Sequence, residues 1–248
     1  MTGTMIITGG GRGIGAATAL LASKKGYSVC VNYTNDRARA DQVVETIRNS
    51  GGKAIAMQAD VSDERAIKTL FETAIAVLGP LTALVNNAGI TGKLGRLADA
   101  DTENLRRVLE VNVIGTMLCS REAIHHMSTA SGGRGGAIVN ISSRAAQHGS
   151  PNEYVHYAAS KAAVETFTVG LAREVASDGI RVNCVSPGVI ETEIHASSGD
   201  AQRAQRIGSQ VPMQRPGRAD EVAAAILWLL SEEASYCTGS ILAVGGGR

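Results

Sequence analysis

The chain has 248 residues, of which 44% are hydrophobic, and a formal net charge of +1. This length favours one domain with a large core, and the near-neutral charge argues against nucleic acid or an anionic membrane as a partner. Scattered cysteines, histidines without metal-ligand spacing, and the absence of a signal peptide or membrane-spanning stretch predict a cytoplasmic protein without a metal.

The chain begins with a predicted strand, a glycine-rich loop and a helix. The strand covers Thr4–Thr8, and an alanine-rich helix extends to about Lys25. The loop between them contains Gly9, Arg12, Gly13, Ile14 and Gly15. This order presents free backbone N–H groups at a helix N-terminus to a phosphate. The dinucleotide fingerprint fits only in its permissive form, Gly11-x-Gly13-x-x-Ala16, so a glycine-rich turn without a ligand stays open as an alternative.

The end of the second predicted strand bears on the choice of dinucleotide. NAD-binding sheets usually carry an acidic residue there, which accepts hydrogen bonds from the ribose. Here residues 32–34 are Asn-Tyr-Thr, with no carboxylate to repel a 2′-phosphate. Arg12, together with Arg37 or Arg39, would pair with that phosphate. Asp36 is still within reach of a ribose, but we expect NADP rather than NAD.

Apolar strands and helices alternate over the rest of the chain. Helices are predicted over 36–50, 62–78, 101–129, 151–176 and 220–230, and strands over 28–32, 53–58, 82–85, 138–141, 180–185 and 241–244. Continuous apolar strands that alternate with helices are typical of a parallel sheet covered on both faces. We therefore predict a doubly wound α/β Rossmann fold of about seven strands in one domain, residues 1–248. Residues 192–216, irregular in pattern, are expected to form a substrate lid.

Short polar or glycine-containing motifs directly follow several predicted strands. They are Asp60-Val61, Asn86-Asn87-Ala88-Gly89, Ser142-Ser143 and Pro187-Gly188. The carboxyl ends of parallel strands lie at one edge of a sheet, and ligands bind beyond them. We therefore expect these motifs and the glycine loop to line one binding edge.

Residues 136–161 hold the main candidates for catalysis: a buried strand, two serines, and a helix with Tyr157 and Lys161. Ser150–Glu153 has the form of a capping box with proline at the first helical position. That start places Tyr157 in the second turn, with Lys161 one turn later on the same face. A free phenol titrates near about pH 10, and we expect the Lys161 ammonium to lower the pKa of Tyr157. Ser143 would hydrogen-bond the substrate oxygen that exchanges a proton with Tyr157.

In these motifs the sequence resembles the short-chain dehydrogenase/reductase family over essentially its whole length. The matching motifs are Thr8-Gly9-x-x-x-Gly13-x-Gly15, Asn86-Asn87-Ala88-Gly89, Asn112, the Ser143 region, Tyr157-x-x-x-Lys161 and Pro187-Gly188. Within the family, the chain is similar to bacterial NADP-dependent 3-oxoacyl-carrier-protein reductases and glucose dehydrogenases. The resemblance implies reversible hydride transfer between NADP(H) and a small carbonyl compound or secondary alcohol, and a homotetramer.

The resemblance also implies roles for individual residues. Tyr157 would be the proton donor in carbonyl reduction, Lys161 would bind the nicotinamide ribose, and Ser143 would orient the carbonyl oxygen. Asn112 would hold a water in a proton relay. With the loop and charge arguments above, the expected cofactor contacts are Gly9, Arg12, Gly13, Ile14, Gly15, Asn32, Tyr33, Asp60, Val61, Asn86, Ala88, Gly89, Tyr157, Lys161, Pro187, Gly188, Ile190 and Thr192.

Some alternatives stay open. The interval from Ser143 to Tyr157 is one residue longer than the family's commonest spacing, so Ser142 is an alternative to Ser143. A non-catalytic protein that senses a dinucleotide or another ligand on the same fold is an alternative function. The substrate is not specified: an acyl thioester, a sugar and other carbonyl compounds all fit. Tyr154 is expected in the pocket wall, and an acidic substrate would have four candidate partners, Arg203, Arg206, Arg215 and Arg218.

Overall fold

Seven parallel strands form one sheet in the order β3-β2-β1-β4-β5-β6-β7. The computed structural model describes residues 2–192 and 203–248, with side chains from residue 206 onward in the second part. The strands are β1 (Thr4–Ile7), β2 (Ser28–Tyr33), β3 (Ala54–Gln58), β4 (Leu81–Asn86), β5 (Gly136–Ile141), β6 (Ile180–Pro187) and β7 (Ile241–Val244). The predicted doubly wound α/β Rossmann fold is confirmed.

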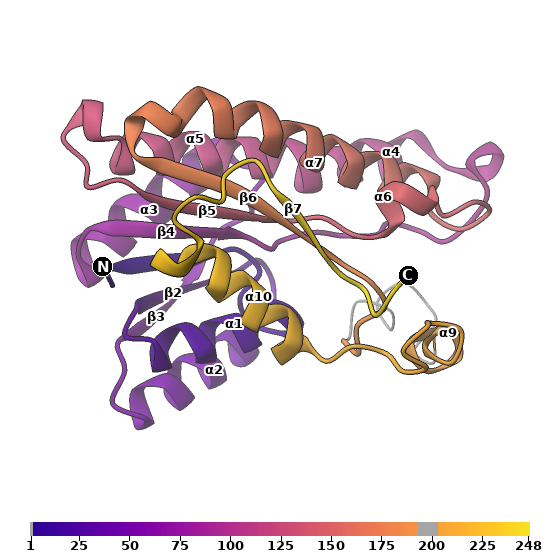
Figure 1. Ribbon diagram of the computed structural model, residues 1–248, viewed down its shortest axis with the longest axis horizontal. Helices are drawn as coiled ribbons and strands as arrows, with labels where there is room; N and C mark the ends of the chain where they lie inside the picture. The colour runs from indigo at the N-terminus through magenta and orange to yellow at the C-terminus, as the bar shows by residue number, and fades with distance from the viewer. Residues whose placement is uncertain (1, 193–202) are drawn as a thin grey trace.

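Helices cover both faces of this sheet (Figure 1). They are α1 (Gly13–Lys24), α2 (Arg37–Asn49), α3 (Glu64–Leu78), α4 (Thr102–Leu109), α5 (Gly115–Met127), α6 (Ala145–His148), α7 (Val155–Val175), α9 (Arg203–Gly208) and α10 (Ala219–Leu230). Residues of α1, α2 and α10 belong to one hydrophobic core, and residues of α3, α5 and α7 belong to a second. Within the described ranges, no helix combines the length and apolar character needed to cross a membrane.

Alternate residues of each central strand enter opposite cores. In β1, Met5 and Ile7 pack in the core with α1, α2 and α10, while Ile6 packs in the core with α3, α5 and α7. In β5, Val139 and Ile138 divide in the same way. Because both faces of the strands are covered, their sequences are continuous apolar runs rather than alternating ones.

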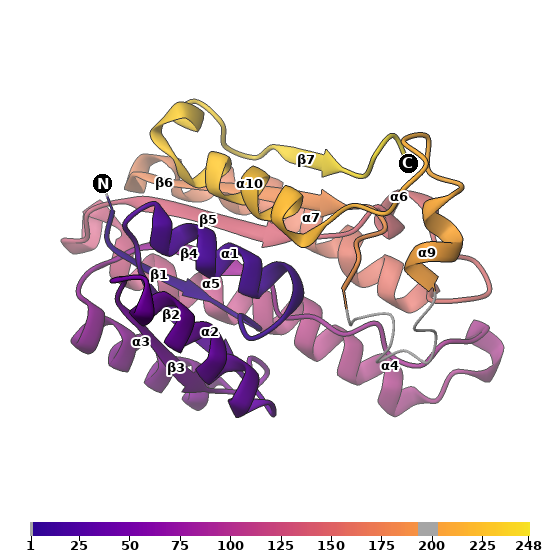
Figure 2. The same ribbon diagram turned by 90° about the horizontal axis from the view of Figure 1, so that it is seen from below.

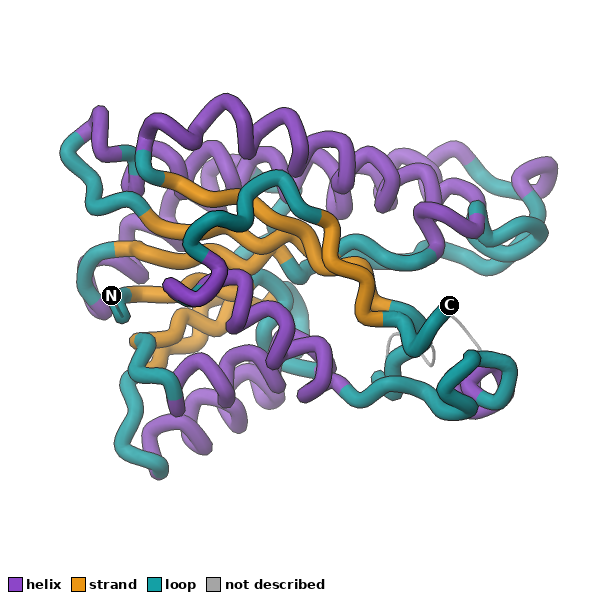
Figure 3. The backbone as a smooth tube through the Cα atoms, in the orientation of Figure 1, coloured by secondary structure: helices purple, strands orange, loops and turns teal. Residues whose placement is uncertain are grey.

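The strand order places a crevice at one edge of the sheet. From β1 the sheet grows to one side through β2 and β3, and to the other side through β4 to β7. Ligands of such folds bind at this reversal, beyond the carboxyl ends of the strands. The arrowheads in Figure 2 point toward the side on which helix α9 lies, and Figure 3 shows loops, coloured teal, beyond the strand ends on that side. The predicted motifs therefore meet at this edge.

The long helical stretch predicted over 101–129 is confirmed, but it is not regular throughout. A π-helical turn, Glu110–Ile114, separates α4 from α5. It contains Asn112, whose side chain hydrogen-bonds both backbone groups of Ile90. Such turns are rare and frequently lie at functional sites. Helical periodicity cannot reveal this turn, because it accompanies a contact with a segment distant in the sequence.

The predicted helix start at Ser150–Glu153 was also wrong. Ser150 and Asn152 have left-handed backbone conformations, with φ of 44° and 61°, so these residues form a turn instead. Helix α7 begins at Val155, which puts Tyr157 in its first turn rather than its second. Tyr154 is buried, and the Glu153 carbonyl accepts a hydrogen bond from Gly95. These tertiary contacts fix the turn and override the local capping signal.

The predicted lid at 192–216 contains one described helix, α9. Ile190 and Gly217, which lie just outside the two ends of this segment, pair in a parallel β-bridge. Residues 193–202 of that prediction lie outside the described residues.

Candidate active site

The loops that follow the strands line two adjoining hollows. The first, about 400 Å³, is lined by the glycine loop and the ends of β2 and β3, and is called here the glycine-loop hollow. The second, about 380 Å³, contains Tyr157 in its wall and is called the tyrosine pocket. Ile14, Asn87, Gly89 and Thr192 line both, so the two hollows form one groove.

Most predicted site residues meet in this groove. Those that line it are Gly9, Arg12, Gly13, Ile14, Tyr33, Asp60, Val61, Ala88, Gly89, Ser143, Tyr157, Lys161, Pro187, Gly188, Ile190 and Thr192. The other predicted residues, Gly15, Asn32, Asn86 and Asn112, do not line either hollow. Each of these four has contacts that explain its place beneath the surface.

The glycine loop is shaped for an anion at the N-terminus of α1. Gly9 has a left-handed backbone, with φ of 61°. A Cβ at Gly15 would lie 2.5 Å from the Gly9 carbonyl oxygen, so only glycine lets the helix approach the loop. No side chain caps the first turn of α1, and that turn holds no acidic residue. Uncapped N–H groups and the helix dipole therefore suit this cradle to a pyrophosphate.

Asn32 supports the glycine loop from behind instead of lining the groove. It is buried; its Oδ1 accepts a hydrogen bond from the Gly9 amide at 3.2 Å, and its Nδ2 donates to the Ala59 carbonyl at 3.0 Å. The asparagine at the end of β2 thus ties the loop to the end of β3. Its side chain is thus engaged within the protein, and the expected cofactor contact of Asn32 stays a prediction.

Asn86 likewise belongs to the interior. Its Nδ2 donates to Ser120 Oγ and to Asn140 Oδ1, both at 2.9 Å. The neighbouring Asn87 lines the groove and donates to the carbonyls of Thr8 and Gly9. Of this pair, Asn87 is the one that lines the groove, and the expected contact of Asn86 along the cofactor stays a prediction.

Charges at the end of β2 meet at the glycine-loop hollow. Arg12, Asp36 and Arg39 all line it, and the Arg39 Nε lies 3.3 Å from the Asp36 carboxylate. Arg37 is directed elsewhere, since it pairs with Asp41 at 3.2 Å and does not line the hollow. Of the two arginines weighed as partners for a 2′-phosphate, Arg39 is the one at the groove.

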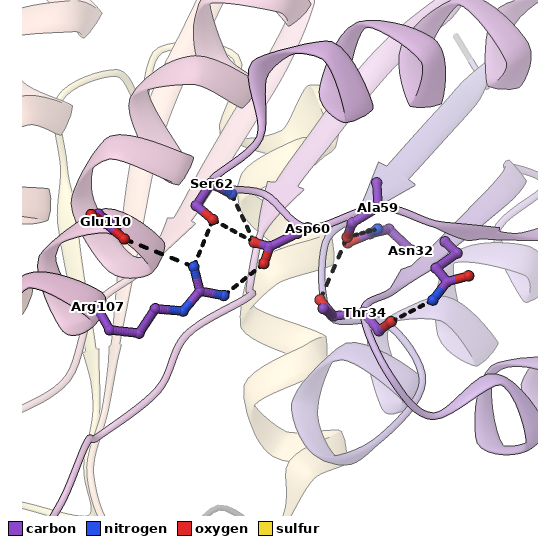
Figure 4. Close-up of polar contacts among 8 residues, drawn as sticks. Asn32, Thr34, Ala59, Asp60, Ser62, Arg107 and Glu110 are labelled. Carbon is purple, nitrogen blue, oxygen red and sulfur yellow. Dashed lines mark hydrogen bonds and ion pairs between the residues drawn. The ribbon is translucent and has the colours of Figure 1, made fainter. Parts of the chain in front are cut away.

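The far end of the glycine-loop hollow holds an ion-pair network (Figure 4). Arg107 of α4 donates to the Asp60 carboxylate at 2.6 Å and to Ser62 Oγ at 2.7 Å, and it also faces Glu110. Burial alone would raise the pKa of Asp60, but hydrogen bonds from Ser62 and Arg107 outweigh it and hold that pKa below its usual range. Asp60 therefore stays ionised, and Arg107 is a groove residue that sequence patterns did not single out.

Tyr157, Ser143 and Tyr154 form the polar and aromatic wall of the tyrosine pocket. Ser143 shares a side-chain hydrogen bond with Tyr157, and its Oγ also accepts the Ala145 amide at 3.1 Å. The Tyr154 ring meets the Tyr157 ring edge-on, with 6.3 Å between centroids. Both tyrosines line the pocket, as expected.

The expected effect of Lys161 on Tyr157 is not found. Desolvation by burial raises the pKa of Tyr157 to about 12, against a smaller lowering by its hydrogen bond with Ser143. Burial also lowers the pKa of Lys161 to about 8. The Lys161 Nζ donates to the Ile141 carbonyl at 2.7 Å and lies 5.7 Å from the centre of the Tyr157 ring. Tyr157 is therefore a phenol at neutral pH in this structure.

Ser142 and Ser143 have different surroundings. Ser142 is buried, and its Oγ lies 2.8 Å from Glu165 Oε1. Glu165, also buried, accepts hydrogen bonds from Ser186 Oγ and from Gln147 Nε2 as well. This cluster joins the ends of β5 and β6 to α6 and α7, and it was not predicted, because no sequence pattern marks a buried glutamate on a helix. Both serines line the tyrosine pocket, and Ser143 is the one whose side chain interacts with the Tyr157 hydroxyl.

Asn112 lies under the groove in the π-helical turn. Its Nδ2 also donates to Ser160 Oγ at 3.0 Å, and the side chain has no exposed surface. Both side-chain groups of Asn112 are thus engaged, and its main-chain carbonyl accepts a hydrogen bond from Thr116 Oγ at 2.8 Å. A Cβ at Gly89 would lie 3.3 Å from both Asn112 Oδ1 and Lys161 Nζ, so these groups meet behind Gly89.

The arginines predicted as partners for an acidic substrate lie elsewhere or are paired. Arg215 pairs with Glu221 at 2.6 Å and Arg218 with Asp220 at 2.9 Å, and neither lines the pocket. Side chains of residues 203–205, including Arg203, lie outside the described part, and Arg206 has a polar contact of its own. The arginines that do line the tyrosine pocket are Arg144 and Arg248, which no sequence motif had marked.

Comparisons with known proteins agree on one family. A family model described as enoyl-(acyl carrier protein) reductase matches residues 9–248. The chain is 52% identical to an uncharacterised oxidoreductase of Escherichia coli, YgfF, over 98% of both proteins, and 41% identical to glucose 1-dehydrogenase 2 of Bacillus subtilis over 98% of this chain and 93% of the relative. A solved short-chain dehydrogenase/reductase from Serratia marcescens superposes with a TM-score of 0.90 at 33% identity, covering 99% of this chain and 97% of that one.

Proposed function

The chain is an oxidoreductase of the short-chain dehydrogenase/reductase family, and from that premise we propose that it transfers a hydride between NADP(H) and a carbonyl compound or secondary alcohol, with Tyr157 as general acid and base. The observation that carries the proposal is a half-buried phenol that shares a hydrogen bond with a serine in the wall of an open pocket. A phenol in that position is ready to protonate a substrate oxygen.

The residues of the groove fit the dinucleotide. The uncapped N-terminus of α1 and the glycine loop would hold the pyrophosphate, and Arg12 with Arg39 would hold the 2′-phosphate. The end of β3, with Asp60 and Val61, would lie along the adenine. When bound, the dinucleotide supplies or accepts the hydride.

Three side chains would handle the substrate oxygen and its proton. Ser143 would donate a hydrogen bond to the carbonyl oxygen, and Tyr157 would transfer its proton to that oxygen in reduction and take it back in oxidation. Lys161, buried at the pocket wall, would bind the nicotinamide ribose and supply positive charge beside the phenolate that reduction leaves. Its bond to the Ile141 carbonyl supports this role by fixing the amine at the end of β5.

Asn112 would take part in proton delivery after each turnover by holding a water of the relay. Its side chain braces the Ile90 backbone and Ser160, and its Oδ1 lies behind Gly89. Pro187, Gly188, Ile190 and Thr192 would contact the nicotinamide end of the cofactor, since all four line the tyrosine pocket. We also propose that the protein works in the cytoplasm on a small molecule, without a metal.

Turnover of NADPH with a panel of aldehydes and ketones tests this function. The panel should include glucose, assayed in the oxidative direction with NADP, and an acetoacetyl thioester, since these separate two of the substrate classes. Oxidation of NADPH by at least one carbonyl compound, faster than of NADH, is the expected result. Tight binding of NADPH without turnover on any substrate would instead favour the alternative of a non-catalytic sensing protein.

A further inference from the structure

A buried carboxylate behind the tyrosine pocket has no part in the chemistry described so far. Glu165 lies on α7, is buried, and lines neither hollow. Its carboxylate accepts three hydrogen bonds, from Ser142 Oγ at 2.8 Å, Gln147 Nε2 at 2.7 Å and Ser186 Oγ at 3.2 Å. In the part of the chain that the structure describes, no lysine, arginine or histidine forms an ion pair with it.

The three neutral donors make the burial of Glu165 tolerable. Taking a carboxylate out of water is costly unless new hydrogen bonds replace those to water. A carboxylate accepts hydrogen bonds and donates none, so each partner side chain is oriented with a donor toward it. Loss of any one donor would leave a buried acceptor less well satisfied, and the position of each donor is therefore strongly constrained.

The donors come from three segments that surround the tyrosine pocket. Ser142 directly follows β5, Ser186 lies near the end of β6, and Gln147 belongs to α6. Glu165 therefore ties α6 to α7 and to both strand ends. The two serines are already held by the paired strands, whereas α6 lies outside the sheet. The bond from Gln147 thus matters most for the place of α6.

Helix α6 depends on contacts with its neighbours. It has only four residues, Ala145–His148, and a helix that short is not stable by itself. Two of these residues are alanines, and Gln147 is the one whose amide reaches Glu165. Ser143 is coupled to this helix, because its carbonyl accepts one amide N–H of α6 at 2.9 Å and its Oγ accepts another at 3.1 Å. A shift of α6 would therefore displace Ser143.

The other end of the link lies on the helix that carries the proposed acid. Tyr157, Lys161 and Glu165 follow one another at intervals of four residues and so lie along one side of α7. The side-chain hydrogen bond between Ser143 and Tyr157 joins the start of α6 to the same helix. The bond between Gln147 and Glu165 thus spans the same two helices, and it limits how far the serine and tyrosine hydroxyl groups separate.

Building on the proposed function, we propose that Glu165 is a positioning residue for the reaction. Through Gln147 it fixes α6 against α7, and this holds the Ser143 hydroxyl where it bonds Tyr157 and the substrate oxygen. Glu165 itself touches neither substrate nor cofactor. Because displacements of about 1 Å in reacting groups can cost a large factor in rate, a small shift of α6 would slow the proton transfer.

Gln147→Ala tests the link without removing the buried carboxylate. Gln147 is exposed, so this change does not put folding at risk. We expect kcat to fall by about tenfold on any carbonyl compound that the wild type reduces, while the Kd for NADPH stays within about twofold because the glycine loop is not involved. Gln42→Ala, the same change at an exposed position on α2 outside both hollows, is the control and should leave both constants within about twofold.

Reversing the polarity of the link provides a rescue. Gln147→Glu sets one carboxylate against another, and Glu165→Gln sets one amide N–H group against another, so each alone should lower kcat by about tenfold or more. The double variant restores one donor and one acceptor, and its kcat should return to within about threefold of the wild type. Urea unfolding midpoints of all three variants show whether each one folds.

The Ser143→Ala background separates positioning from a general structural role. If Glu165 acts through Ser143, Gln147→Ala should change kcat by less than about twofold once the serine hydroxyl is gone. Wild-type kcat in Gln147→Ala, no recovery in the folded double variant, or a full tenfold loss in the Ser143→Ala background would each overturn the positioning role, while the oxidoreductase function stands. If the wild type turns over no carbonyl compound, the proposed function fails, and this role of Glu165 fails with it.

Discussion

The adjacent serines at the end of β5 differ in what their hydroxyl groups touch, and this predicts different consequences of removing each one. Ser143→Ala should lower kcat by about 10²-fold with little change in stability, because its hydroxyl faces Tyr157 in the pocket. Ser142→Ala should lower the free energy of unfolding by about 1–3 kcal/mol, because it removes a hydrogen bond from buried Glu165. Urea unfolding and steady-state kinetics of both variants check this.

The two variants serve as controls for each other. A Ser142→Ala protein with normal stability and greatly reduced kcat would identify Ser142 as the catalytic serine, contrary to the assignment made here.

Lys161 predicts a pH dependence of stability. Its pKa is lowered by burial to about 8, from 10.5 in an exposed lysine, so the folded protein binds fewer protons than the unfolded chain between these values. Burial of the Lys161 ammonium therefore lowers the free energy of unfolding by its full amount below pH 8. This loss of stability becomes smaller as pH rises from 8 toward 10.5. Lys161→Met should stabilise the cofactor-free protein at pH 7, by a margin that shrinks at pH near about 9.5.

Urea unfolding of the wild type and Lys161→Met at both pH values measures that margin. Lys24→Met, at an exposed position on α1, is the control and should show no comparable trend. A margin that is constant or grows with pH would contradict the lowered pKa.

At the level of elements, two glycines in helices predict opposite effects of the same substitution. At Gly15 in α1, a Cβ would meet the Gly9 carbonyl oxygen at 2.5 Å and Asn87 Nδ2 at 2.6 Å. Gly15→Ala should therefore cost about 1–3 kcal/mol of stability and weaken NADPH binding, as the loop shifts. At Gly170 in α7, no atom apart from the adjoining helix backbone and chain neighbours lies within 4 Å of the added Cβ, and Gly170→Ala should stabilise the protein by about 0.5–1 kcal/mol. Thermal unfolding of both variants measures these changes in stability. If Gly15→Ala and Gly170→Ala destabilised the protein equally, the packing argument would be refuted.

The strands could be predicted because their signal is local. Met5–Ile7 and Ile138–Val139 are buried on both faces, and such strands are continuous apolar runs bounded by glycine or polar residues. The start of α7 could not be predicted in this way. Ser150–Glu153 has the residue pattern of a capping box. The helix nevertheless starts later, because Tyr154 is buried and the Glu153 carbonyl accepts a hydrogen bond from the distant Gly95.

The groove shows the same division. Residues at or just beyond strand ends, such as Gly9, Asp60 and Pro187, could be assigned to one edge because parallel topology brings strand ends together. The orientation of individual side chains could not be predicted in this way. Asn86 turns into the interior, while its neighbour Asn87 lines the groove. Arg248 joins Arg144 across more than a hundred residues of sequence, and no spacing rule connects them.

For the whole molecule, exposed apolar side chains bear on assembly. One group, Leu94, Leu97, Leu109 and Ile114, surrounds α4, and a second, Trp228, Tyr236 and Ile241, lies on α10, β7 and the segment between them. We propose that neighbouring copies cover both groups in a homotetramer, because large exposed apolar groups mark association surfaces. Light scattering coupled to gel filtration should give a mass of about four chains, and Leu109→Glu or Trp228→Glu should reduce it. A monomer at micromolar concentration would contradict the tetramer.

The central claim is that the Tyr157 hydroxyl exchanges a proton with the substrate oxygen. The most direct test compares kcat of the wild type and Tyr157→Phe on any carbonyl compound that the wild type reduces, with the Kd for NADPH measured on both. The account predicts that kcat falls by about 10²- to 10⁴-fold while NADPH still binds. A Tyr157→Phe protein that binds NADPH and turns over at the wild-type rate would contradict it.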